Sequence, residues 1–150
     1  SNAMPSAMNE RTVAELEKLL RYIAANLKQR GREILTNYPI TPPQFVALQW
    51  LLEEGDLTVG ELSNKMYLAC STTTDLVDRM ERNGLVARVR DEHDRRVVRI
   101  RLLEKGERII EEVIEKRQRD LANVLESFSD EEIVVFERCL RKLHQEMTKE

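Results

Sequence analysis

The sequence has little of what marks secreted, membrane-spanning or catalytic proteins. Only two cysteines, Cys70 and Cys139, occur in 150 residues, too few for a disulfide framework, so a cytoplasmic location is expected. No apolar run approaches the roughly 20 residues of a membrane helix, and no N-terminal segment resembles a secretion signal. The histidines, His93 and His144, lie far apart, and no glycine-rich phosphate loop, metal-spaced Cys/His cluster or nucleophile motif occurs. These absences argue against a membrane protein, an enzyme, and a bound metal or cofactor.

Charge is plentiful but unevenly distributed. The whole chain has a net charge of −3, from 24 Lys and Arg against 27 Asp and Glu. Within residues 79–101, eight arginines stand against four acidic residues, which leaves +4 there and −7 on the remainder. This asymmetry predicts a localised anion-binding surface, although a well-solvated hairpin would account for the same charges. The eight are Arg79, Arg82, Arg88, Arg90, Arg95, Arg96, Arg99 and Arg101.

The N-terminal part reads as one long helix followed by two short capped ones. Apolar residues recur every three or four positions from Val13 to Leu27, which predicts an amphipathic helix over about 9–36. Two threonines are then each followed three residues later by Gln or Glu, the pattern of a capping box: Thr41 with Gln44, and Thr58 with Glu61. We therefore expect helices that begin at about residues 42 and 59.

The stretch "CSTTTDLVDRMERNGLV" (70–86) predicts a third short helix. Leu76, Val77 and Met80 have helical spacing, and Asn83-Gly84 is a stop signal. Yet the first turn has four consecutive residues with hydroxyl side chains, Ser71 to Thr74, and threonine is a poor helix former. Two short helices joined by a tight turn form a helix-turn-helix unit.

After Gly84 the hydrophobic period changes from helical to alternating. In "LVARVR" and "VVRIRL" apolar residues alternate with arginines, which predicts two strands, each with one apolar and one basic face. The link "DEHDRR" lacks glycine and predicts a longer polar loop. The expected fold is mainly α with a small antiparallel β-hairpin, arranged as a winged helix-turn-helix domain.

Two amphipathic helices complete the chain, the second opened by a capping box from Ser129 to Glu132. Their apolar stripes, with that of the N-terminal helix, exceed what one small domain can cover, so we expect a homodimer. The predicted segments are a tag remnant at 1–3, an N-terminal dimerisation helix at 9–36, the winged domain at 41–103, and C-terminal dimerisation helices at 104–150.

The block from residue 41 to 106 resembles the MarR family of bacterial transcriptional regulators. The likeness is carried by "LSNKM" and "STTTDLVDRMERNGLV" followed by "RVRDEHDRRVVRIRL". Its most specific part is Asp94 with Arg96, then Ile100 with Leu102, and Gly106 four residues beyond. The resemblance implies an obligate dimer that binds a pseudo-palindromic operator in double-stranded DNA, with 71–83 as recognition helix and 91–96 as wing tip. It further implies a repressor that a small lipophilic or phenolic effector releases.

Most of the candidate DNA contacts lie in these two segments, and Arg88 and Arg90 lie in the predicted strand just before the wing tip. Short hydroxyl side chains in the first turn of a recognition helix suit base edges, unless Ser71 is only an N-cap. By resemblance, Arg96 enters the minor groove while Asp94 fixes its side chain; an ordinary loop ion pair is the alternative. For Arg79 and Arg82, pairing with acids of the same helix is the alternative to DNA contact. The full candidate set is Ser71, Thr72, Thr73, Thr74, Asp75, Arg79, Arg88, Arg90, His93, Asp94, Arg95 and Arg96.

Several residues depart from the family pattern or leave alternatives open. Asp75 is acidic where members often read the groove with a basic or neutral residue, and Leu103 replaces the usual Thr or Ser cap of the next helix. Cys70 adjoins the recognition helix, which keeps a thiol redox sensor open as an alternative. Cys139 is expected in the core. A protein-interaction module and a ligand-independent DNA-binding protein are further alternatives, and no motif places an effector site.

Overall fold

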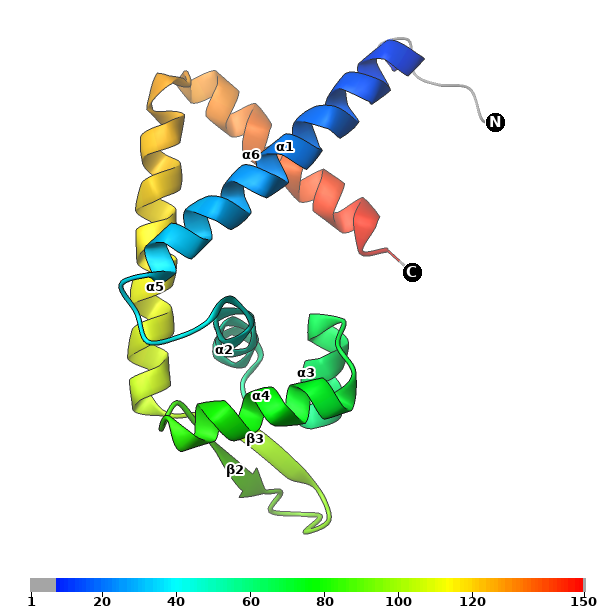
Figure 1. Ribbon diagram of the computed structural model, residues 1–150. Helices are drawn as coiled ribbons and strands as arrows, with labels where there is room; N and C mark the ends of the chain where they lie inside the picture. Colours follow the sequence, from blue (N-terminus) through cyan, green and yellow to red (C-terminus); the bar gives the residue numbers. More distant parts are fainter. Residues whose placement is uncertain (1–7, 150) are drawn as a thin grey trace. The chain divides into compact units, whose positions relative to one another are not determined.

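The computed structural model describes residues 8–149, so the predicted tag remnant at 1–3 lies outside the described residues (Figure 1). The chain divides into two compact units, and the boundary follows Val113 inside α5. The elements, in chain order, are α1 (Glu10–Leu35), α2 (Pro42–Glu54), β1 (Leu57–Thr58), α3 (Val59–Met66), α4 (Cys70–Arg82), β2 (Val86–Arg90), β3 (Val98–Leu102), α5 (Glu104–Val124), the 3-10 turn η1 (Leu125–Ser127) and α6 (Asp130–Met147). The mainly α fold with a β-hairpin is confirmed.

All three predicted capping boxes are present. In each, the cap hydroxyl accepts from the backbone N–H three residues on, and the Gln or Glu side chain accepts from the backbone N–H of the cap. The caps are Thr41, Thr58 and Ser129. These reciprocal bonds satisfy two otherwise orphaned donors at each helix start, which is why the boundaries were readable from the sequence.

The sheet has three strands in the order β1-β3-β2, one more than the expected hairpin. Leu57 of β1 pairs with Ile100 of β3, and on the other side of β3 Ile100 pairs with Arg88. Directly opposed residues of antiparallel strands share one face of the sheet. The arginines of β2 therefore share a face with the apolar residues of β3, and the expected basic faces of the two strands point in opposite directions.

The core of the first unit lies between α2, α3, α4, the sheet and the first turns of α5. Its largest fully buried apolar side chains are Leu48, Leu51, Leu62, Val77, Met80, Leu85, Val86, Ile100, Ile110 and Val113. The start of α5 lies against the backbone of Leu85. The backbone N–H of Leu103, the residue before α5, donates to the carbonyl oxygen of Leu85 at 3.0 Å. A Cβ at Gly106 would lie 2.4 Å from that same oxygen, so this position requires glycine.

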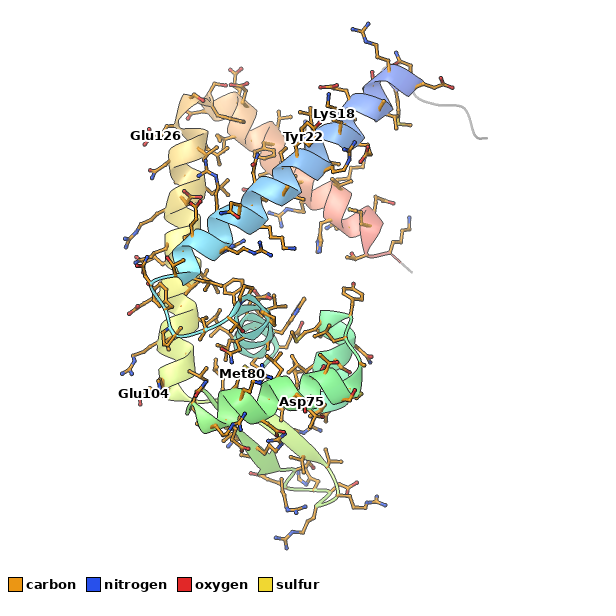
Figure 2. The ribbon with its side chains drawn as sticks, viewed as in Figure 1. Lys18, Tyr22, Asp75, Met80, Glu104 and Glu126 are labelled. Carbon is orange, nitrogen blue, oxygen red and sulfur yellow. The ribbon has the colours of Figure 1, made fainter. Side chains whose placement is uncertain are left out.

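Apolar side chains remain exposed on α1 in the first unit and on α5 and α6 in the second. On α1, where Figure 2 labels Lys18 and Tyr22, the exposed set is Val13, Leu16, Leu19, Leu20, Tyr22, Ile23 and Leu27. In the second unit it is Leu121, Val124, Phe128, Val134, Val135, Leu140, Leu143 and Met147. Cys139 is exposed in the single chain as well, so its expected place in the core is wrong for one protomer.

Candidate nucleic-acid interface

The helix α4 begins after a tight turn whose backbone is left-handed at one residue. Tyr67 ends α3 with φ at 56°, and its backbone N–H donates to the carbonyls of Ser63 and Asn64. Ala69 is the N-cap of α4 and makes no side-chain cap hydrogen bond. Since α4 starts at Cys70, the interpretation of Ser71 as the N-cap is wrong. The hydroxyl of Ser71 is therefore not used for capping.

The hydroxyls of the first turn lie in different environments. Ser71 and Thr72 are exposed and Thr74 is half-buried. Thr73 is fully buried, and its hydroxyl donates to the carbonyl of Ala69 at 3.1 Å. Thr73 faces the core with Leu76, Val77 and Met80. Its side chain cannot reach DNA, so the prediction of Thr73 as a DNA contact is wrong.

The opposite side of α4 is a polar face of four residues. Ser71, Asp75, Asp78 and Arg82 follow the spacing i, i+4, i+7 and i+11, which places them on one side of a helix, and all four are exposed. Asp75 and Met80, both labelled in Figure 2, belong to the exposed and the buried side of α4. This exposed face is the part of α4 that can approach a ligand as large as DNA.

The wing tip is ordered by one carboxylate that the sequence analysis did not select. Oδ2 of Asp91 accepts from the backbone N–H groups of His93 and Asp94 at 3.0 and 2.9 Å. Oδ1 accepts from Nε of Arg99 at 3.0 Å. These bonds hold the pKa of Asp91 below its ordinary value, first through Arg99 and then through the two backbone donors. An Asp that opens a turn by bonding the backbone two residues on is the available sequence signal.

Arg96 projects from this loop and is held by Asp94. Its side chain is 90% exposed, and its Nε and a terminal nitrogen donate to the two carboxylate oxygens of Asp94 at 3.0 and 3.1 Å. The hydrogen bond from Arg96 lowers the pKa of Asp94 and raises that of Arg96. The expected contact between Asp94 and Arg96 is thus present, and the guanidinium is oriented while it remains accessible.

The other arginines divide into engaged and unengaged groups. Arg88 binds Asp78 and Glu81, Arg99 binds Asp91 and Glu61, Arg101 binds Asp56, and Arg90 donates to the carbonyl of Arg95. Within residues 8–149, Arg79, Arg82 and Arg95 form no ion pair, so the alternative of pairing within α4 is not realised. Arg88 and Arg90, both predicted as DNA contacts, are therefore engaged inside the domain.

Cys70, the first residue of α4, is exposed, and its Sγ lies 3.4 Å from the hydroxyl oxygen of Ser63. Over the described part of the chain, no group of three or more His, Cys, Asp or Glu is placed to hold a metal ion. No helix in that part is long and apolar enough to cross a membrane.

Two short helices, α3 and α4, are joined by a tight turn and followed by an antiparallel sheet whose loop carries an exposed arginine, and this arrangement defines a winged helix-turn-helix protein. The sequence model of the MarR family matches residues 40–98. HTH-type transcriptional regulator YsmB of Bacillus subtilis (strain 168) is 68% identical over 135 residues, which cover 90% of this chain and 92% of that protein. The chain belongs to the MarR family, whose members are DNA-binding transcriptional regulators and not enzymes.

Two solved structures support this assignment. A MarR family protein from Bacillus stearothermophilus is 98% identical, with a TM-score of 0.91 over 95% of this chain and 99% of that one. Streptococcus pneumoniae FabT, solved in complex with DNA, is 25% identical, with a TM-score of 0.79 over 90% of this chain and 96% of that one.

Proposed function

We propose that the protein is a cytoplasmic repressor that binds a pseudo-palindromic operator as a homodimer and is released by a small lipophilic or phenolic effector. The observation that carries the DNA-binding part is the exposed Arg96, which Asp94 orients at the wing tip. The effector rests on the family alone, since many members respond to such ligands.

The exposed side of α4, which is the polar face together with Thr72, has side chains suited to reading a major groove. Ser71 and Thr72 place short hydroxyl side chains in the first turn, where recognition helices contact base edges, and threonine methyls can touch thymine C5-methyl groups. Asp75 is exposed, and its carboxylate can accept a hydrogen bond from N4 of cytosine. These groups would give the protein sequence preference rather than strong attraction to the backbone.

The wing tip supplies positive charge for the adjacent minor groove. A guanidinium is attracted to the narrow, electronegative minor groove of A·T-rich DNA. Asp94 reduces the number of conformations that Arg96 must give up on binding, because both carboxylate oxygens already hold it. Arg95 and His93 are exposed beside it and are suited to phosphate contacts.

Dimerisation through the exposed apolar residues of α1, α5 and α6 would present two such surfaces. Two-fold protein symmetry matches an operator with two half-sites, as in other helix-turn-helix proteins. Each half-site then needs only modest affinity, because the second protomer binds as part of the same complex.

The test is fluorescence anisotropy with duplexes tiled from the DNA upstream of the gene, at about 50 and about 200 mM salt. We expect tight, salt-sensitive binding to one pseudo-palindromic fragment and a loss of about tenfold or more for Arg96→Ala. Arg101→Ala is the control and should change affinity little. Arg101 pairs with Asp56 and lies on the face of the sheet opposite to Arg88 and Ile100.

Other outcomes distinguish the alternatives. Weak binding that is equal on all fragments and indifferent to Arg96 would contradict the operator proposal and favour a protein-interaction module. Specific binding that no phenolic or lipophilic compound weakens would favour a ligand-independent DNA-binding protein. Binding lost on peroxide treatment, and retained by Cys70→Ser, would favour the redox sensor.

A further inference from the structure

The recognition helix is unexpectedly acidic for a segment that approaches DNA. Between Cys70 and Arg82, α4 carries Asp75, Asp78 and Glu81 against two arginines, a net charge of −1. Asp78 belongs to the polar face, between Asp75 and Arg82. An uncompensated carboxylate at that place would repel the phosphate backbone at short range.

The structure compensates these carboxylates from outside the helix. One terminal nitrogen of Arg88 on β2 lies 2.7 Å from Oδ1 of Asp78, and the other lies 2.7 Å from Oε1 of Glu81. The backbone N–H of Arg88 also donates to Oε2 of Glu81 at 3.2 Å. One arginine thus compensates carboxylates on two successive turns of α4. With Arg88 included, the three acidic residues of α4 are matched by three arginines, and their net charge is zero.

The environment of Arg88 indicates an internal rather than a DNA-directed role. Its side chain is 28% exposed, whereas that of Arg96 is 90% exposed. Burial alone would lower the pKa of Arg88, but its hydrogen bonds to Asp78 and Glu81 raise it above the ordinary value. Two N–H groups of this guanidinium donate to carboxylates at 2.7 Å, so its positive charge is shared with Asp78 and Glu81 rather than left for a phosphate.

We propose that Arg88 supports operator binding without touching DNA, by masking the negative charge of Asp78 and Glu81 on the recognition helix. This inference rests on the proposed function, since it concerns how α4 approaches an operator. Arg88 is a positioning residue: it acts through two carboxylates, and its effect should vanish when they are neutral.

A double-mutant cycle on the full-length protein tests the mask. Arg88→Met is introduced into the native chain and into an Asp78→Asn/Glu81→Gln chain, and operator affinity is measured by anisotropy at low salt. We expect a loss of about tenfold in the native chain and of about twofold or less in the neutralised chain, a coupling typical of residues in one ion-pair network. Comparing backgrounds cancels the gain in affinity that removing two carboxylates causes by itself.

Two results would overturn the proposal that Arg88 masks the charge of Asp78 and Glu81. An equal or larger loss in the neutralised chain would show that Arg88 contacts DNA directly, and no loss in either chain would show that the carboxylates do not matter. Arg101→Met with and without Asp56→Asn is the matched control, because it breaks an arginine–carboxylate pair outside α4, and should show no coupling.

The remaining controls separate folding from binding. Circular dichroism and a thermal melt establish that each variant is folded; if Arg88→Met melts below the assay temperature, Arg88→Gln replaces it in the same cycle. Native protein that binds no fragment specifically would contradict the proposed function and the mask together. Specific binding that Arg96→Ala weakens, with no coupling at Arg88, would contradict the mask alone.

Discussion

Thr72 and Thr73 are adjacent and chemically identical, yet one lies on the surface and the other in the core. A helix turns by about 100° per residue, so a run of hydroxyls cannot all face the same ligand. Thr72 is exposed, whereas Thr73 is fully buried and donates to the carbonyl of Ala69. At the scale of single residues, the rotation of α4 therefore decides which hydroxyls can contact DNA.

Valine substitutions at these two positions should change different properties, the stability at Thr73 and the operator binding at Thr72. Thr73→Val removes a buried hydrogen bond at nearly constant volume and should lower the free energy of unfolding by about 0.5–1.5 kcal/mol, with operator affinity unchanged. Thr72→Val should weaken or re-specify operator binding with little change in stability. Urea denaturation and anisotropy on both variants check this pair; a Thr73→Val protein of native stability that has lost operator affinity would contradict the core assignment.

The wing tip should stay ordered throughout the neutral range and lose its order only in acid. The hydrogen bond from Arg96 lowers the pKa of Asp94 below its ordinary value of 3.8. A carboxylate with a depressed pKa in the folded state stabilises the loop above 3.8, and this contribution is lost as the pH falls through the lower, folded value.

A carboxyl NMR titration tests the pKa of Asp94. We expect a midpoint for Asp94 below 3.8 in the native protein. In Arg96→Ala the midpoint should rise but remain depressed, since the backbone N–H of residue 96 still donates to Oδ1. An unchanged midpoint in Arg96→Ala would show that the side-chain contact is absent in solution.

At the scale of elements, the junction of α4, β2 and α5 depends on one close approach. Gly106 lies so near Leu85 that a Cβ would be 2.4 Å from the backbone oxygen and 2.9 Å from the side chain of Leu102. Backbone cannot yield as a flexible side chain can, so α5 would have to shift. The glycine noticed in the sequence as part of a family motif is thus explained by packing.

Gly106→Ala should destabilise the fold by about 1–3 kcal/mol through this clash. Gly60→Ala is the matched control, because Gly60 is also helical and its Cβ would meet nothing nearer than 3.8 Å. That variant should be neutral or slightly stabilising, since alanine restricts the unfolded chain. Thermal melts at one protein concentration compare the two; equal melting temperatures would contradict the requirement for glycine at Gly106.

At the scale of the whole molecule, the apolar surface of α1 is the feature that a single protomer leaves unexplained. Leu16 and Ile23 are 53% and 50% exposed although they belong to a regular apolar stripe. Burying such a stripe against a second chain would contribute roughly 25 cal/mol per Å² of apolar area. The proposed homodimer accounts for this exposure.

A charge placed in the stripe should therefore separate the protomers. Ile23→Glu should shift sedimentation equilibrium from dimer toward monomer and abolish tight operator binding, because each half-site is then bound alone. Ala25→Glu adds the same charge on the opposite side of α1 and should leave the dimer intact. A dimer that persists unchanged in Ile23→Glu would place the interface elsewhere.

Local features of this protein were determined by the sequence alone. Capping boxes, helical spacing and the Asp94–Arg96 contact join residues within one helical turn or one loop, so they depend on neighbours that the sequence lists in order. The winged helix-turn-helix fold followed from their succession. The sequence also predicted that the hydroxyl run lies in a helix and that the arginines after Gly84 lie in a hairpin, but not the direction in which each side chain points.

Tertiary structure alone decided which of those side chains are available. The pairing of β1 with β3 joins segments far apart in the chain, and the strand register placed the arginines of β2 and β3 on opposite faces of the sheet. The rotation of α4 buried Thr73, and the packing of β2 on α4 placed Arg88 in ion pairs with Asp78 and Glu81. Alternation along one strand specifies two faces but not which of them meets the core, since that depends on register and on partners distant in sequence.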